Sequence, residues 1–271
     1  MFTQMGGIRR NDIQVGFILN TNYGYIQVLE IKDSKNVRIN FIEYPFETVA
    51  ASNAIRRGEV KNPMRPTVCG VGFIGVGKHP CRVSGILNPV YQTWADMLKR
   101  VYKQRTQDKI RQYAGTSVHS HWHNFQNFAD WYHAQIDKFG KVNHSSQLDK
   151  DFLIPGNRQY GPDTCCVIPS DVNTLLTDAA FARGSLPIGI RKNGNGFIAH
   201  VSANNKQKHS VTYPTIADAQ RAYWSEKFRV IQETAIRYWH YLPEPLAYRL
   251  LLFNWSDALA YYGDDARIWS E

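Results

Sequence analysis

Residues 188–202 read IGIRKNGNGFIAHVS, two apolar-rich runs separated by a turn of asparagine and glycine. This pattern predicts a β-hairpin with strands over 188–192 and 197–202. A third run at 208–213 follows a second turn, and Thr215, with an aspartate three positions later, resembles the capping signal that starts a helix. We therefore expect a small domain in which three strands are backed by one helix.

The rest of the chain divides at turn-rich places. Alternating apolar residues between positions 14 and 42 predict short strands, and we expect a small antiparallel β-barrel there. From Val90 the apolar residues recur at helical spacing, which predicts amphipathic helices. The fold class is thus predicted to be α+β and multidomain. The expected segments are a basic β-barrel-like module at 1–85, a central module at 86–182, the strand-and-helix domain at 183–240 and a helical tail at 241–271.

The net charge is unevenly distributed along these segments. The chain carries 32 Lys and Arg against 23 Asp and Glu, a formal charge of +9. Segment 1–85 has 11 basic and 6 acidic residues, a sum of +5, and segment 183–240 has 9 and 3, a sum of +6. Two basic modules beside a nearly neutral one are typical of a protein that holds a phosphate backbone. We expect double-stranded DNA as the partner; ordinary solvated faces are the alternative.

Two further patterns narrow the class of protein. No run approaches the ~20 apolar residues of a membrane span, and the first residues lack a secretory pattern. We therefore expect a cytoplasmic protein with no membrane partner, whose oligomeric state stays open.

The glycines at 70–75 match G-x-G-x-x-G, but Pro80 follows and no helical pattern begins, so we interpret them as a close backbone approach rather than a nucleotide loop.

The central module contains LDKDFL at 148–153, GNRQYGPDTCC at 156–166 and PSDVN at 169–173. Together these stretches resemble the H-N-H nuclease core of phage-type homing endonucleases, and the resemblance covers about residues 90–178. It implies a β-hairpin packed on a helix around one divalent ion. Carboxylate and amide oxygens suit Mg²⁺, which is the expected cofactor. If the chain is phage-encoded, the host cytoplasm is its expected location.

The resemblance also implies roles for single residues. Asp149 and Asn173 fall at the metal-ligand positions, and Thr164 lies near the central asparagine of the family. Lys150 stands where the family has its catalytic histidine, and a protonated lysine is a poor base unless it is strongly desolvated. His144, six positions earlier, is a candidate substitute. Either another group serves as the base, or the site is inactive.

The last basic segment carries a second resemblance. PIGIRK at 187–192, GFIAHV at 196–201 and YPTIADAQRAY at 213–223 resemble the APETALA-type, integrase-like DNA-binding domain. That fold lays a three-stranded sheet in the major groove of DNA. The resemblance implies DNA contacts from strand and turn residues, namely Arg191, Lys192, His200, Lys206 and Lys208.

Taken together, the charge distribution and the two resemblances imply a metal-dependent DNA endonuclease of the homing type that hydrolyses phosphodiester bonds. The alternative is a DNA-binding protein that keeps the H-N-H scaffold without turnover, because Lys150 replaces the histidine. A third hypothesis is a protein-interaction or virion-associated factor, suggested by the small β-rich module and the aromatic helices. The sequence does not identify the DNA target.

Overall fold

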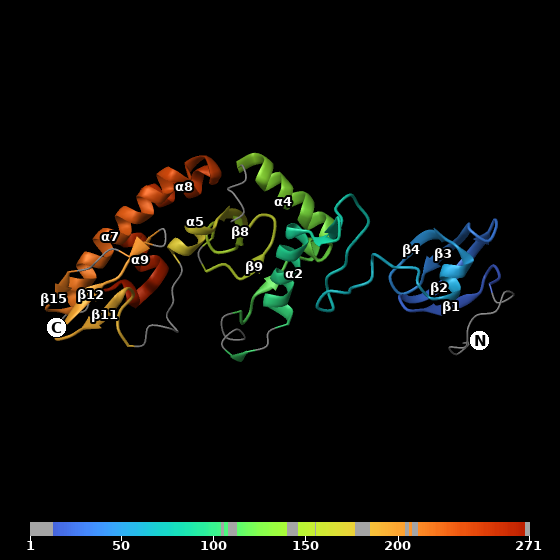
Figure 1. The fold of residues 1–271 in the computed structure, drawn as a ribbon, viewed down its shortest axis with the longest axis horizontal. Coiled ribbons are helices and arrows are strands. Elements are labelled where there is room, and N and C mark those ends of the chain that lie inside the picture. The colour runs from blue at the N-terminus through green and yellow to red at the C-terminus, as the bar shows by residue number, and fades with distance from the viewer. Residues whose placement is uncertain are drawn as a thin grey trace. The chain divides into compact units, whose positions relative to one another are not determined.

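In a computed structural model the protein contains both helices and sheets, as predicted (Figure 1). The structure describes residues 13–103, 106–107, 113–139, 146–154, 156–176, 185–203, 206–207 and 211–268. The chain divides into two compact units, Met1–Asp130 and Trp131–Glu271. No described helix is long and apolar enough to span a membrane.

The first unit begins with a four-stranded antiparallel sheet in the order β1-β2-β3-β4. Its strands are β1 (Ile18–Thr21), β2 (Gly24–Ile31), β3 (Val37–Phe41) and β4 (Phe46–Ala50). Alternate residues of β2 and β3 are buried, so one face of the sheet forms a small core. The short helix α1 (Ser52–Arg56) adds Ile55, which is fully buried in the same core.

The predicted small β-barrel is wrong, because this sheet is not closed. In the described residues β1 and β4 are the two edges and do not pair with each other. A barrel requires strands tilted and staggered until the first meets the last. Here the side chain of Ile55 packs against the apolar face of the sheet, so a helix covers the core and closure is not needed.

The remainder of the first unit is built around two helices. Its elements are β5 (Arg82–Val83), β6 (Ile86–Leu87), α2 (Pro89–Tyr102), β7 (Ser117–Val118), η1 (Ser120–His123) and α4 (Phe125–Phe139), the last continuing beyond Asp130. Trp94 of α2 is fully buried and donates a hydrogen bond from Nε1 to the carbonyl of Trp122, 2.7 Å away. Its ring lies 5.4 Å from that of Phe125. Phe125 and Phe128 of α4 are fully buried and belong to this core.

The glycine run at 70–75 packs against these helices. A Cβ on Gly72 would lie 2.4 Å from Leu98 Cδ1, and one on Gly75 would lie 2.1 Å from Asn124 Oδ1. The backbone of Phe73 also bonds to His123 and Phe125. Close packing explains why these positions are glycine.

The second unit contains a hairpin followed directly by a helix. Strand β8 (Ser146–Asp149) pairs antiparallel with β10 (Cys166–Pro169), and α5 (Ser170–Leu175) starts at the next residue. The short strand β9 (Gln159–Tyr160) lies in the connection between β8 and β10. Ile168 of β10 and Val172 of α5 are fully buried together, which fixes the helix against the hairpin.

The rest of this unit is a sheet and a set of helices. The sheet has the order β11-β12-β15, and a separate pair, β13-β14, follows β12 along the chain. The elements are β11 (Ile190–Asn193), β12 (Gly196–Ala199), β13 (Ser202–Ala203), β14 (Lys206–Gln207), β15 (Thr212–Tyr213), α7 (Ile216–Arg237), η2 (Trp239–Tyr241), α8 (Glu244–Leu251), α9 (Trp255–Tyr262) and η3 (Gly263–Ala266). The three predicted strands and their helix are thus present, although each strand is shorter than predicted.

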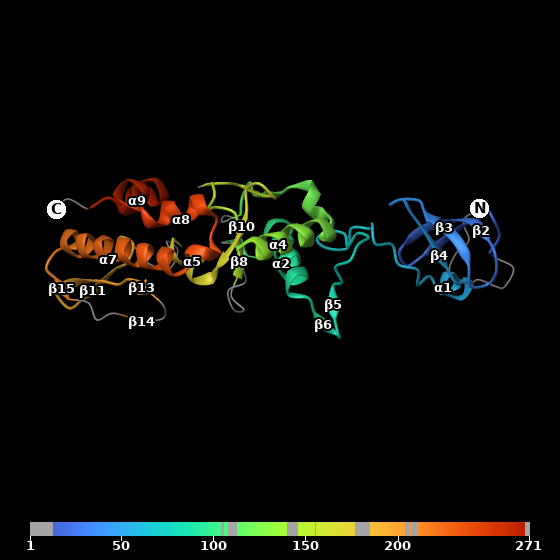
Figure 2. The same ribbon diagram turned by 90° about the horizontal axis from the view of Figure 1, so that it is seen from above.

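Helix α7 organises the packing of the second unit. It lies between the sheet on one side and α8 and α9 on the other (Figure 2). The Thr215 side chain caps its start by accepting a hydrogen bond from the backbone N–H of Asp218, as the sequence signal predicted.

One hydrophobic core runs through this whole unit. It joins Ile168 of the hairpin, Ile190 of the sheet, Trp224 of α7 and Leu246 of α8. The segments expected as three modules therefore share apolar side chains across positions 182/183 and 240/241. A hairpin with a single short helix buries little apolar surface by itself, so sharing a core stabilises each part.

Candidate functional site

The sheet of the second unit has one covered and one exposed face. Ile190 of β11 is buried beside α7, so by strand alternation Arg191 points to the opposite face. Arg191 pairs in register with Ile198 of β12, which pairs in turn with Thr212 of β15. We call the face formed by Arg191, Asn193, Ile198 and Thr212 the open face. Its arginine, asparagine and threonine side chains are exposed.

A polar contact across the strands orders this face. The Asn193 amide donates from Nδ2 to Thr212 Oγ1, 2.9 Å away. Gly196 is the register partner of Asn193, and a Cβ there would be 2.6 Å from the Tyr213 carbonyl oxygen and 2.7 Å from Thr212 Cγ2. Glycine at this position is therefore required for the central strand to approach its neighbour.

The structure separates the residues predicted to bind DNA. Arg191 is on the open face, whereas Lys192 follows the alternation of Ile190 and lies exposed on the other face. His200 comes two residues after Ile198, and both burial and the nearby Arg191 charge lower the pKa of its imidazole. The backbone of Lys206 is in β14, and Lys208 lies outside the described residues.

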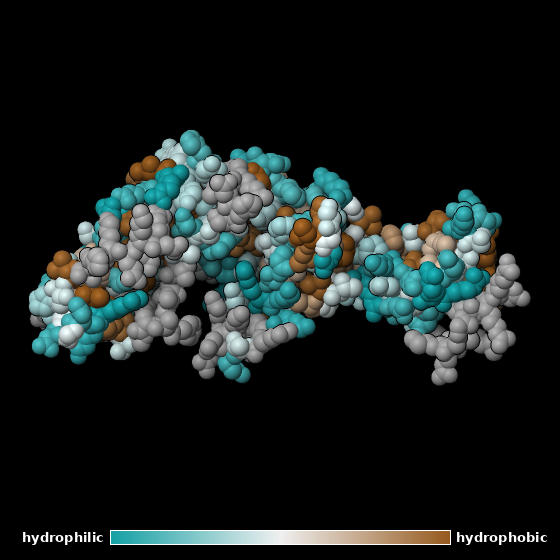
Figure 3. Space-filling model, viewed as in Figure 1, coloured by the Kyte–Doolittle hydropathy of each residue, from teal (hydrophilic) through white to brown (hydrophobic). Residues whose placement is uncertain are grey.

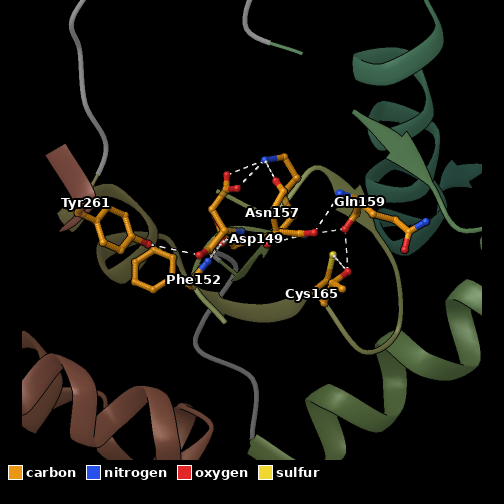
Figure 4. A network of polar contacts seen from close by, with 9 residues as sticks. Asp149, Phe152, Asn157, Gln159, Cys165 and Tyr261 are labelled. Carbon is orange, nitrogen blue, oxygen red and sulfur yellow. Dashed lines mark hydrogen bonds and ion pairs between the residues drawn. The ribbon is translucent and has the colours of Figure 1, made fainter. Parts of the chain in front are cut away.

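The second candidate region surrounds Asp149, at the end of β8. Its Oδ1 accepts hydrogen bonds from the backbone N–H groups of Asp151 and Phe152, both at 2.7 Å (Figure 4). Burial nevertheless raises the pKa of this carboxyl, because desolvation outweighs the stabilising bonds. Asp149 thus combines a capping role for the following loop with a carboxylate kept largely from water.

Lys150 is held by its own loop. Its ammonium lies 2.6 Å and 2.7 Å from the two carboxylate oxygens of Asp151 and donates to the Asn157 carbonyl at 3.0 Å. The same nitrogen lies 6.0 Å from the centre of the Tyr160 ring. These contacts occupy the ammonium with partners from its own loop.

Asn157, which the sequence reasoning missed, links the two sides of this loop. Its Nδ2 donates to the carbonyls of Lys150 and Gln159, at 2.8 Å and 2.7 Å. Thr164 donates from Oγ1 to the same Gln159 carbonyl at 2.7 Å (Figure 4). A Gly-Asn pair within a turn-rich segment was the signal available for Asn157. Thr164, predicted near a catalytic position, acts here as a support of the loop.

Asn173 lies on α5, the helix that follows the hairpin. Its Nδ2 donates to Gln147 Oε1 at 2.5 Å. Gln147 precedes Asp149 by two residues, which places them on one face of β8 at a separation of about 7 Å along the strand. His144, the predicted substitute base, lies outside the described residues.

The predicted Mg²⁺ ligands, Asp149 and Asn173, offer few oxygen atoms in the described residues. Asp149 can offer one carboxylate oxygen, because its other oxygen accepts two backbone N–H groups, and both oxygens of Asp151 contact Lys150. Asn173 donates from Nδ2 to Gln147, so its Oδ1 is the atom that it could offer to a metal. No cluster of three or more His, Cys, Asp or Glu side chains suited to a metal occurs within the described ranges. We therefore assign no hydrolytic step to a metal ion in this arrangement.

Comparison with protein-family models, with curated proteins and with solved structures yields no match for this chain. The two family resemblances accordingly stay predictions. The geometry of the open face and of the loop after β8 is therefore the basis for proposing a function.

Proposed function

We propose that this protein binds double-stranded DNA through the open face. The observation that carries the proposal is an exposed three-stranded sheet face with Arg191 and the Asn193–Thr212 pair, backed on its other side by α7. Arginine donates to phosphates and to guanine edges, and asparagine pairs with adenine. A face of this composition on a rigid support suits contact with a DNA groove.

The charge distribution supports the same proposal. Segment 183–240 carries 9 basic and 3 acidic residues, and the whole chain carries +9. A positive field attracts the phosphate backbone and supplies affinity that does not depend on base sequence. The open face would then add local contacts to a general attraction.

The test is a binding titration with fluorescently labelled duplex DNA. Arg191→Ala should weaken affinity about fivefold or more, since one good charged contact contributes ~1 kcal/mol or more. Arg221→Ala is the matched control, because Arg221 is an exposed arginine of the same unit that pairs with Asp218 on α7. Equal effects of the two substitutions would argue against the open face as the DNA contact.

A metal-dependent endonuclease is the second candidate. The observation in its favour is the order β8–β10–α5, with a partly buried carboxylate, Asp149, at the end of the first strand. This order is the one that the H-N-H resemblance implies. The contacts of Lys150 and Thr164 favour the inactive alternative, in which the scaffold supports DNA binding alone.

A nicking assay on supercoiled plasmid with a series of divalent ions distinguishes the two candidates. If the protein cuts, Asp149→Ala should abolish nicking, and Asp163→Ala, which changes an exposed carboxylate in the same connection, should not. Binding without product under every divalent ion would reject the endonuclease and retain the DNA-binding function.

A further inference from the structure

A small hairpin in the first unit carries an exposed apolar tip. Val83 of β5 and Ile86 of β6 are directly opposed in register, and both point to the same side. Their side chains are strongly exposed, at 57% for Val83 and 74% for Ile86. We call this pair the apolar tip. On the face seen in Figure 3, hydrophobic residues (brown) occur in groups among hydrophilic ones (teal).

The turn that joins the two strands is tight and internally bonded. Ser84 and Gly85 both have positive φ, 49° and 79°, as a two-residue type I′ turn requires. Arg82 donates from Nη1 to the Gly85 carbonyl at 2.9 Å. The apolar tip is therefore presented by an ordered turn.

The base of the hairpin is fixed to helices α2 and α4. Asn88 caps α2 and also donates from its side chain to the Pro80 carbonyl at 2.9 Å. On the other side, the buried Gln126 of α4 accepts from the His79 N–H and donates to the His79 carbonyl, at 2.9 Å and 3.0 Å. These hydrogen bonds hold the base of the hairpin in place, so the position of its tip is fixed relative to α2 and α4.

The chemistry of the hairpin suits DNA. Residues 78–87 include two exposed cations, Lys78 and Arg82, and no acidic residue. Lys78 lies 3.4 Å from a carboxylate oxygen of Asp130 on α4, so Arg82 is the cation of this hairpin with no acidic partner among the described residues. Proteins that bind the minor groove use such cations for the backbone and insert apolar side chains between base steps. A stable protein interface needs about 800 Å² from each partner, far more than two side chains provide. A wedge between bases needs only one or two.

We propose that the apolar tip inserts into the minor groove of bound DNA and opens a base step. The inference rests on the proposed DNA binding and extends it by a second contact with a different role. The open face would hold the duplex, and Val83 and Ile86 would unstack one step and kink it, as other apolar wedges do.

The experiment uses the full chain and a duplex labelled at both ends for energy transfer, with 2-aminopurine placed at successive positions. Binding of the unchanged protein should bend the duplex and raise 2-aminopurine fluorescence at one step. The double variant Val83→Thr, Ile86→Thr keeps branching at Cβ and should lose both signals. Val49→Thr, an exposed valine on β4, is the matched control and should keep them.

The possible results separate this inference from the proposed function. Binding without bending or 2-aminopurine response, or an equal response from the double variant, would overturn the wedge and leave DNA binding intact. No binding by the unchanged protein would overturn both. Sedimentation serves as the second measurement: self-association lost in the double variant, with DNA distortion unchanged, would assign the tip to a protein contact and overturn the wedge.

Discussion

Lys227, on α7, is a buried cation within the core of the second unit. Only 7% of its surface is exposed, and within the described part of the chain burial alone, with no charged neighbour, acts on the pKa of its ammonium. Burial lowers its pKa from 10.5 to about 8, because the charged form is poorly solvated. The unfolded chain therefore holds this proton more tightly than the folded protein does.

Replacing this lysine should stabilise the protein at neutral pH. Lys227→Met removes the cost of a buried charge, and we expect the free energy of unfolding at pH 7 to rise by roughly 1–3 kcal/mol. Between pH about 8 and 10.5 the unfolded state binds more protons, so the unchanged protein gains stability and the difference shrinks. Urea unfolding of both proteins at pH 7 and pH 10 measures this difference in the free energy of unfolding. A difference that does not change with pH would contradict the lowered pKa of Lys227.

Lys150 offers a test of a structural against a catalytic role. Its side chain is 12% exposed and that of its partner Asp151 is 43% exposed. Lys150→Ala should lower the free energy of unfolding by about 1–2 kcal/mol, less than a fully buried pair because water screens Asp151. Lys99→Ala, at an exposed pair with Asp96, should cost under ~0.5 kcal/mol. Equal, negligible effects in thermal unfolding would argue against the structural role.

The residue types of the candidate site could be predicted, but their contacts could not. The motif brought Asp149, Lys150 and Thr164 into one region, and the structure places all three around one loop. Their bonds within that loop depend on its backbone path, which spacing does not show. Asn157 was missed because a loop asparagine has the same appearance in a sequence whether or not its side chain links two parts of the loop.

Among the elements, the sheet of the open face depends on one glycine. Gly196→Ala would place a Cβ 2.6 Å from the Tyr213 carbonyl oxygen, so β12 and β15 would have to separate. We expect the free energy of unfolding to fall by roughly 1–3 kcal/mol and DNA affinity to fall with it. Chemical unfolding and a DNA titration measure the two effects.

Gly194, in the neighbouring turn, provides the control. It has a φ of +57°, and a Cβ at this position would have no other atom within 4 Å. Gly194→Ala should therefore cost only the strain of the left-handed conformation, about 1 kcal/mol. A larger effect at Gly194 than at Gly196 would show that backbone strain, and not strand contact, limits this sheet.

Elements with strong local signals were predictable. The turn at 193–196 and the cap at Thr215 both occur where the sequence placed them, because glycine conformation and capping are local. Whether the first four strands close into a barrel could not be predicted from such local signals. Closure depends on whether distant strands meet, and here Ile55 of a five-residue helix fills the core instead.

At the scale of the whole molecule, the chain forms two compact units. The hairpin with the apolar tip belongs to the first unit and the open face belongs to the second. If both bind DNA as proposed, two modest contacts on one chain would raise each other's effective concentration, so neither would have to be tight alone. The shared core of the second unit could not be predicted from the sequence. An apolar pattern shows which residues are buried, but not which distant segment they contact.

The measurement that tests the central claim most directly is the affinity of the full chain for duplex DNA over a salt series. With several phosphate contacts, the logarithm of the association constant should fall linearly with the logarithm of salt concentration, with a slope of about −3 or steeper between ~50 and ~200 mM. Absence of binding at the lowest salt, or an affinity that does not change with salt, would contradict DNA binding by this protein.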